Sequence, residues 1–198
     1  MNIWKGDLYM ISLLNGEICN ISDNSVCMVL SSGIGFEVFC NRKTLSRLEI
    51  QKRHCLFIHT QLSQEDIQLY GFIEERELNF FKMLIKVNGV GCKMAQSILD
   101  LDVATLSESI INNDVKSLTK IKGVGAKTAQ RIILELKNVV ETKYKGLSQQ
   151  LNENVSDAKY ALIALGYNPN DIDEVLINID DSLNSSDIIK MFLKKTNI

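Results

Sequence analysis

A short glycine motif occurs twice in the chain and constrains the fold more than any other feature. Gly-Val-Gly-Cys-Lys-Met-Ala begins at Gly89, and Gly-Val-Gly-Ala-Lys-Thr-Ala begins 34 residues later at Gly123. Apolar residues at helical spacing flank each copy, so each predicts two helices joined by a tight hairpin. Glycine permits the positive φ of such a turn, which we expect to matter at Gly91 and Gly125.

A hairpin of this kind suits a phosphate group. Glycine leaves no side chain to block a close ligand, and the hairpin amides and the next helix N-terminus form an array of donors. A lysine two residues after the second glycine adds a cation. The motif therefore predicts contact with the DNA backbone rather than with bases. The residues expected to bind DNA are Gly89, Val90, Gly91, Lys93, Lys122, Gly123, Val124, Gly125 and Lys127.

Two other interpretations of these glycines compete with DNA binding. A nucleotide-phosphate loop needs a glycine directly before the lysine and another five residues earlier, but those positions hold Ala126 and Ile121. The other interpretation is that both segments are simply tight turns between helices. Two copies in register, with matched lysine and alanine positions, favour a shared binding role.

Residues 8–72 are patterned as short β-strands. Asn15-Gly16 predicts a hairpin between strands at 8–13 and 17–21. Further strands are expected at 25–30, 36–40, 54–61 and 67–72, with a short helix at 42–48. Five or six short strands in this length are typical of a small closed barrel of the OB (oligonucleotide-binding) kind.

Beyond residue 73 the pattern becomes helical. Helices are expected at 74–87, 93–99, 103–112, 115–120, 127–144, 156–165, 170–179 and 185–195. The polar, weakly patterned residues 142–154 predict a linker. The fold class is thus α+β and multidomain. It comprises an OB-fold barrel at 1–72, an all-α tandem helix-hairpin-helix domain at 73–145, a linker at 146–155 and a three-helix, UBA-like domain at 156–198.

Charge and cysteine content narrow the function further. The net charge of −2 argues against a uniformly basic surface that coats DNA. Residues 147–198 carry four basic and eight acidic side chains, so this tail is not expected to hold DNA. The five cysteines show no C-x-x-C spacing, which indicates reduced, mostly buried thiols. We expect a cytoplasmic protein without a membrane span, metal or cofactor.

Taken together, these features resemble the RuvA family, the DNA-binding subunits of the bacterial Holliday-junction branch-migration complex. The resemblance rests on the order of barrel, paired hairpins and small acidic tail, and it covers the chain from Met10. Residues 1–9 are therefore expected to be a dispensable extension. The motifs that carry it are Gly33–Val38, Leu69–Phe72, Leu84–Gly91, Gly123–Ala129 and Ala161–Tyr167.

The resemblance implies a partner set. The family assembles as a homotetramer, or as two tetramers face to face, that holds a four-way junction flat on a concave basic surface. Its C-terminal domain recruits the RuvB ATPase for recombination and repair, so this chain would carry no catalytic residue, and the RuvC resolvase acts in the same pathway. The surface implied for RuvB binding includes Leu162, Leu165, Gly166 and Tyr167, although these residues equally suit the small core.

The family also places two acidic residues at the tetramer centre, where they repel DNA phosphates and help to hold the arms open. An ungapped match puts these positions on Gln64 and Glu65, so the acidic pair Glu65-Asp66 is displaced by one residue. Such a shift turns a side chain to the other face of a strand. Which carboxylate faces the junction stays open, and a solvated turn is the alternative.

Two departures from the family and one alternative function remain. Cys92 and Ala126 stand where many relatives have a proline and often a lysine, so one cation is missing. The alternative function is a helix-hairpin-helix accessory or adaptor protein of another DNA repair complex. An accessory domain of a nuclease or ligase would need carboxylate clusters, a nucleophilic lysine motif or metal ligands, and none stand out.

Overall fold

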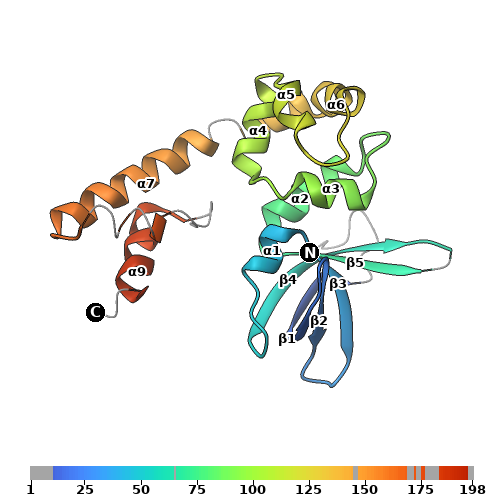
Figure 1. The fold of residues 1–198 in the computed structure, drawn as a ribbon, viewed down its shortest axis with the longest axis horizontal. Helices are drawn as coiled ribbons and strands as arrows, with labels where there is room; N and C mark the ends of the chain where they lie inside the picture. Colours follow the sequence, from blue (N-terminus) through green and yellow to red (C-terminus); the bar gives the residue numbers. More distant parts are fainter. Residues whose placement is uncertain are drawn as a thin grey trace, which may run out of the picture. The chain divides into compact units, whose positions relative to one another are not determined.

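The computed structural model describes residues 11–64, 66–144, 147–168, 172, 175–176 and 183–195, and its ribbon is shown in Figure 1. The chain divides into two compact units, Met1–Val139 and Val140–Ile198. Among the helices described, none has both the length and the apolar character needed to cross a membrane.

A closed five-stranded barrel begins the first unit, as predicted. Its strands are β1 (Leu13–Ile21), β2 (Ser25–Val29), β3 (Gly35–Phe39), β4 (Arg53–Leu62) and β5 (Ile67–Phe72). They close in the order β1-β2-β3-β5-β4, with β3 and β5 parallel and the other neighbours antiparallel. Alternate side chains of β1, such as Leu14 and Ile18, point into the core. This period of two is the alternation expected of a strand with one buried face.

The hairpin predicted at Asn15-Gly16 is wrong. Both residues lie inside β1, a continuous strand of nine residues that pairs with β4 and with β2. A Cβ atom on Gly16 would lie 2.5 Å from the carbonyl oxygen of Val29 and 2.8 Å from Cγ of Met28. Glycine is needed here because another backbone approaches closely, not because the chain turns.

Replacing Gly16 by alanine is expected to destabilise the barrel by about 1–3 kcal/mol, because a methyl group pressed against a backbone carbonyl cannot be relieved by a rotamer change. Gly35→Ala is the matched control, since its Cβ would meet Cys27 and Val29 side chains only at 3.8 Å. Urea denaturation measures both free energies of unfolding. Equal stability of the two variants would contradict this account of Gly16.

Six helices begin in the first unit: α1 (Arg42–Ser46), α2 (Glu75–Leu84), α3 (Cys92–Ile98), α4 (Val103–Ile111), α5 (Val115–Thr119) and α6 (Ala126–Tyr144). All six were predicted, with ends that differ by a few residues. Asn41, Asp102 and Asp114 cap α1, α4 and α5 through their side-chain oxygens.

Helix α2 joins the barrel to the other helices of this unit (Figure 1). Its fully buried Phe81 packs against three rings of the barrel, with centroid distances of 5.3 Å to His59, 5.5 Å to Tyr70 and 4.9 Å to Phe72. Aromatic contacts at these distances add to the area that each ring buries. Helix α2 therefore packs directly on the barrel, while the domain boundary predicted at residue 72 stays a prediction.

The cysteines were predicted to be unpaired and mostly buried. The first part is correct and the second is wrong. All five cysteines are free, but only Cys40 is buried, while Cys19 and Cys55 are exposed. Burial raises the pKa of the Cys40 thiol to about 12, so this thiol stays protonated.

The second unit contains α7 (Leu147–Ala164) and α9 (Ser185–Lys195). Helix occupies residues 147–155, where a linker was predicted, because no glycine or proline interrupts the segment and the packed half of α7 can extend a helix. Gly166, with φ of +91°, follows the helix end as predicted. The helix predicted at 170–179 lies largely outside the described residues. Within that range the structure describes residues 172, 175 and 176, and all three are helical.

Candidate nucleic-acid interface

The two glycine hairpins have matching backbone geometry. Each turn contains one glycine with φ of +90°, Gly89 in the first copy and Gly123 in the second. The hydrogen bonds around these glycines correspond position by position. The N–H groups of Val90 and Val124 donate to the carbonyls of Val87 and Ile121, both at 3.0 Å, and those of Ala95 and Ala129 donate to Gly91 and Gly125, both at 2.9 Å. The sequence repeat is thus a structural repeat.

The expectation of positive φ at the second glycine of each copy is wrong. Gly91 is extended, with φ of −87° and ψ of 170°, and Gly125 is not among the glycines with positive φ. A Cβ atom added at Gly91 or Gly125 would meet nothing within 4 Å. The first glycine therefore makes the turn, and the second leaves the backbone open to a close ligand.

Val90 and Val124 point inward, although both were predicted to bind DNA. Each side chain is 5% exposed, and each amide is already occupied by the hydrogen bond that closes its hairpin. These valines anchor the turns in the helical core. Direct contact of either valine with DNA stays a prediction.

The predicted lysines are exposed, and two of them meet at one groove. The groove has a volume of about 900 Å³ and lies between α3, α4, α5 and the second hairpin. Lys93 from the first copy and Lys122 and Gly123 from the second line it. Lys127 is exposed but does not line this groove. The fold thus brings residues of both hairpins to one surface.

Arg42 and Lys120 also line this groove, and the sequence reasoning missed both. Its charged lining is four cations (Arg42, Lys93, Lys120 and Lys122) and one carboxylate, Asp100. Lys120 stands only two residues before Lys122, so its closeness to the second hairpin could have marked it as a candidate. Arg42 belongs to the barrel segment, and only the fold places it here.

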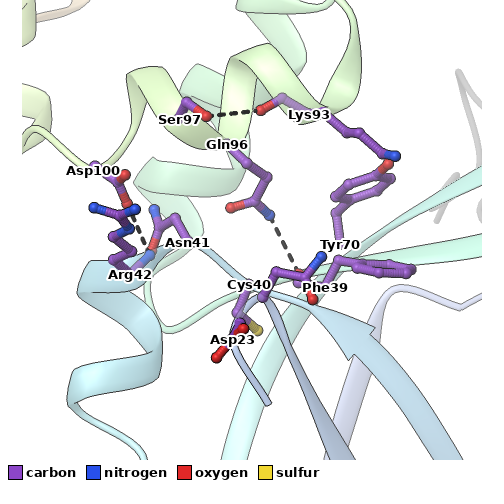
Figure 2. A pocket seen from close by; sticks show the side chains of 11 residues that line it. Asp23, Phe39, Cys40, Asn41, Arg42, Tyr70, Lys93, Gln96, Ser97 and Asp100 are labelled. Atoms are coloured by element: carbon purple, nitrogen blue, oxygen red, sulfur yellow. Dashed lines mark hydrogen bonds between the residues drawn. The ribbon is translucent and has the colours of Figure 1, made fainter. Parts of the chain in front are cut away.

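A smaller pocket of about 270 Å³ continues from this groove toward the barrel. Arg42, Lys93, Ser97 and Asp100 line both cavities. Figure 2 shows Lys93 extending from α3 toward the ring of Tyr70. Burial raises the pKa of Tyr70 to about 12, so its hydroxyl stays neutral.

Arg131 ties the two hairpins together. It lies on α6, after the second hairpin, and its Nη1 donates to the carbonyl oxygen of Asn88 beside the first hairpin, at 2.9 Å. The two residues are 43 positions apart, so no local pattern announces this bond. The bond links α6 to the segment directly before the first hairpin turn.

The acidic segment lies in the turn between β4 and β5, which project from the barrel (Figure 1). Asp66 is exposed, and its Oδ2 accepts a hydrogen bond from Nε2 of Gln68 at 3.0 Å. Gln64 is exposed too, while Glu65 lies outside the described residues. The role of this turn, and which of its side chains faces DNA, stay predictions.

The four tail residues predicted to bind a partner have different environments. Leu162 is fully buried with Ile172 and Phe192, so it belongs to the core. Tyr167 is half-buried, with its ring edge against Phe192. Leu165, which is 64% exposed, and Gly166 lie at the surface. Tyr160 and Ile163 of α7 are also exposed.

Comparison with known protein families accounts for all three parts of the chain. The RuvA N terminal domain matches residues 10–71, the SAM-like helix-hairpin-helix tandem matches residues 81–138, and the RuvA C-terminal domain matches residues 153–195.

Curated relatives are similar over nearly the full length. Three of them are named Holliday junction branch migration complex subunit RuvA. The protein from Clostridium botulinum strain Eklund 17B is 36% identical over 196 residues, covering 94% of this chain and 98% of the relative. That from Rickettsia prowazekii is 36% identical over 197 residues (95% and 98%), and that from Clostridium beijerinckii is 37% identical over 196 residues (93% and 98%).

Proposed function

The chain belongs to the RuvA family, and we propose that it binds four-way DNA junctions through its two hairpins. The observation that carries this proposal is the pair of hairpins with matched geometry, which contribute residues to one groove lined by four cations. The names of the relatives, as subunits of a Holliday junction branch migration complex, support the same reading.

The hairpins are proposed to act on the DNA backbone. The first glycine sets the turn, the second leaves room for a phosphate oxygen, and Lys93 and Lys127 supply cations beside it. At the second hairpin, the N-terminus of the 19-residue helix α6 adds unpaired amides. Contacts of this type carry no base sequence, so the duplex arms of any junction can be held alike.

The assembly around the junction is part of the proposal. The chain acts as a homotetramer, or as two tetramers face to face, with the acidic pair Glu65-Asp66 near the junction centre. There, carboxylates repel the phosphates and help to keep the arms apart. Asp66 is exposed in the turn between β4 and β5, which supports this role.

The C-terminal unit is proposed to recruit the RuvB ATPase in the cytoplasm, in a pathway shared with the RuvC resolvase. The chain itself is then the non-catalytic subunit, and the motor supplies ATP hydrolysis. Leu165, Tyr160 and Ile163 are exposed apolar side chains suited to a protein contact. The excess of acidic side chains in residues 147–198 argues against DNA binding by this unit.

Reversing charge at both hairpins tests the proposed interface. Lys93→Glu combined with Lys127→Glu is expected to lower junction affinity and to flatten its salt dependence, because each lost phosphate contact removes about 0.9 from the slope of log affinity against log salt. The control is Lys52→Glu with Lys116→Glu, which changes the net charge equally at two exposed sites outside the groove. Fluorescence anisotropy across a salt series measures both. Wild-type affinity and slope in the hairpin variant would show that the hairpins face away from DNA.

A further inference from the structure

We propose that Arg42, at the start of helix α1, binds a DNA backbone phosphate in the groove between α3, α4, α5 and the second hairpin. The inference rests on the proposed function, and it adds a contact from the barrel to those expected from the hairpins. Arg42 is exposed and lines both the larger groove and the smaller pocket that continues from it.

The charge balance of the groove favours an anion beside Arg42. Four cations line the larger cavity against the single carboxylate of Asp100. In the smaller pocket Arg42 and Lys93 face Asp23 and the same Asp100. Asp100 has a structural task, since its Oδ1 accepts the backbone N–H of Arg42 at 2.8 Å. The charged lining of the smaller pocket is balanced, so a phosphate diester would meet a net positive lining in the larger groove.

The groove hydroxyls are committed elsewhere, which leaves recognition of an anion to the cations. Three serines donate to groups of their own helices or caps: Ser97 to the carbonyl of Lys93 at 3.2 Å, Ser109 to that of Thr105 at 2.9 Å, and Ser117 to Oδ2 of Asp114 at 2.6 Å. In the part of the chain that the structure describes, Arg42 forms its hydrogen bond through the backbone N–H and not through the side chain. Its guanidinium is a planar donor fork that suits two phosphate oxygens at once.

The backbone of Arg42 is held firmly against the hairpin helices. The preceding residue, Asn41, is buried, donates from Nδ2 to the carbonyl of Leu99 at 2.8 Å, and accepts the N–H of Thr44 at 2.7 Å. Gln96 of α3 donates to the carbonyl of Phe39 at 3.3 Å. These bonds hold the start of α1 against α3. The backbone that carries the Arg42 side chain is therefore already ordered before DNA binds. Such placement lowers the cost of ordering the contact on binding.

The test uses the full-length chain and a labelled synthetic four-way junction. Arg42→Gln is expected to lower the affinity about tenfold, the scale of one lost charged hydrogen-bond contact, and to reduce the salt slope by about one. Arg42→Lys keeps the charge, so it is expected to keep the slope while losing part of the affinity. Lys52→Gln is the matched control, because it removes one exposed positive charge from the barrel outside both cavities.

Each outcome decides the proposal. Equal affinity and slope for Arg42→Gln and Lys52→Gln, with tight binding by the wild type, would overturn the Arg42 contact and leave the proposed function standing. Failure of the wild type to bind the junction would overturn both. Thermal melting of Arg42→Gln is expected to match the wild type, since the backbone N–H bond to Asp100 is retained. A loss of affinity with an unchanged salt slope would mean a structural role and would also overturn the phosphate contact.

Discussion

Replacing Gly89 and Gly123 together by valine is expected to lower the affinity for a four-way junction by about a hundredfold or more. Both glycines have φ of +90°, a conformation that L side chains rarely adopt. Forcing a β-branched residue into it costs about 1–3 kcal/mol at each site, and the hairpin relieves this strain by changing shape. Anisotropy with a labelled junction measures the loss, and circular dichroism checks that the barrel and helices remain.

Alanine at the second glycines separates the two tasks of the motif. Gly91 is extended and its added Cβ would meet nothing within 4 Å, as at Gly125, so Gly91→Ala with Gly125→Ala is expected to fold as the wild type does. Any loss of affinity in this variant then reports the close approach of DNA to the backbone. Wild-type affinity in the Gly89 and Gly123 double variant would show that the hairpin turns do not hold the junction.

Truncation after Tyr144 is expected to abolish branch migration driven by RuvB while junction binding persists. The cut leaves α6 whole and removes residues 145–198, which carry eight acidic and five basic side chains. In the proposed assembly the tail tethers the motor, so its removal is expected to lower the effective concentration of the motor at the junction. Strand exchange of a synthetic junction with RuvB and ATP measures coupling, and anisotropy measures binding.

A surface substitution in the full-length chain controls for the deletion. Leu165→Asp changes a side chain that is 64% exposed, so it is expected to weaken motor coupling and to leave junction affinity and folding unchanged. Leu162 is unsuitable, because a charge at this fully buried position would disrupt the small core. Loss of junction binding with intact motor coupling in the truncated chain would mean that the roles of the two parts are reversed.

The fold was predictable where its determinants are local. Alternating apolar residues predicted the strands, and the glycine repeat predicted two helix-hairpin-helix units that share the same hydrogen bonds. Asn15-Gly16 failed as a hairpin signal because the decisive fact is the close approach of Val29, which is made only in the closed barrel. Residues 147–155 were not predicted to be helical, because helix propagation from the packed half of α7 outweighs weak local patterning.

The site was predictable at the level of the motif but not of each residue's task. The repeat singled out the glycines and lysines as candidates, but it did not indicate which glycine turns the chain or that Val90 and Val124 are buried. Arg42 and Arg131 were missed because their partners lie 58 and 43 residues away. Contacts between residues so far apart in the sequence arise only when the chain folds. The periodic patterns of apolar residues therefore do not predict them.

Competition between a four-way junction and a duplex tests the central claim most directly. The full-length chain is bound to a labelled junction, and unlabelled competitors are added: the same junction, or linear duplexes that contain the sequences of its arms. A protein that recognises junction shape is expected to need about a thousandfold more duplex than junction for half-displacement, the lower end of the usual gap between specific and non-specific DNA binding. Equal displacement by duplex and junction, compared per base pair, would contradict the account and leave only general affinity for the DNA backbone.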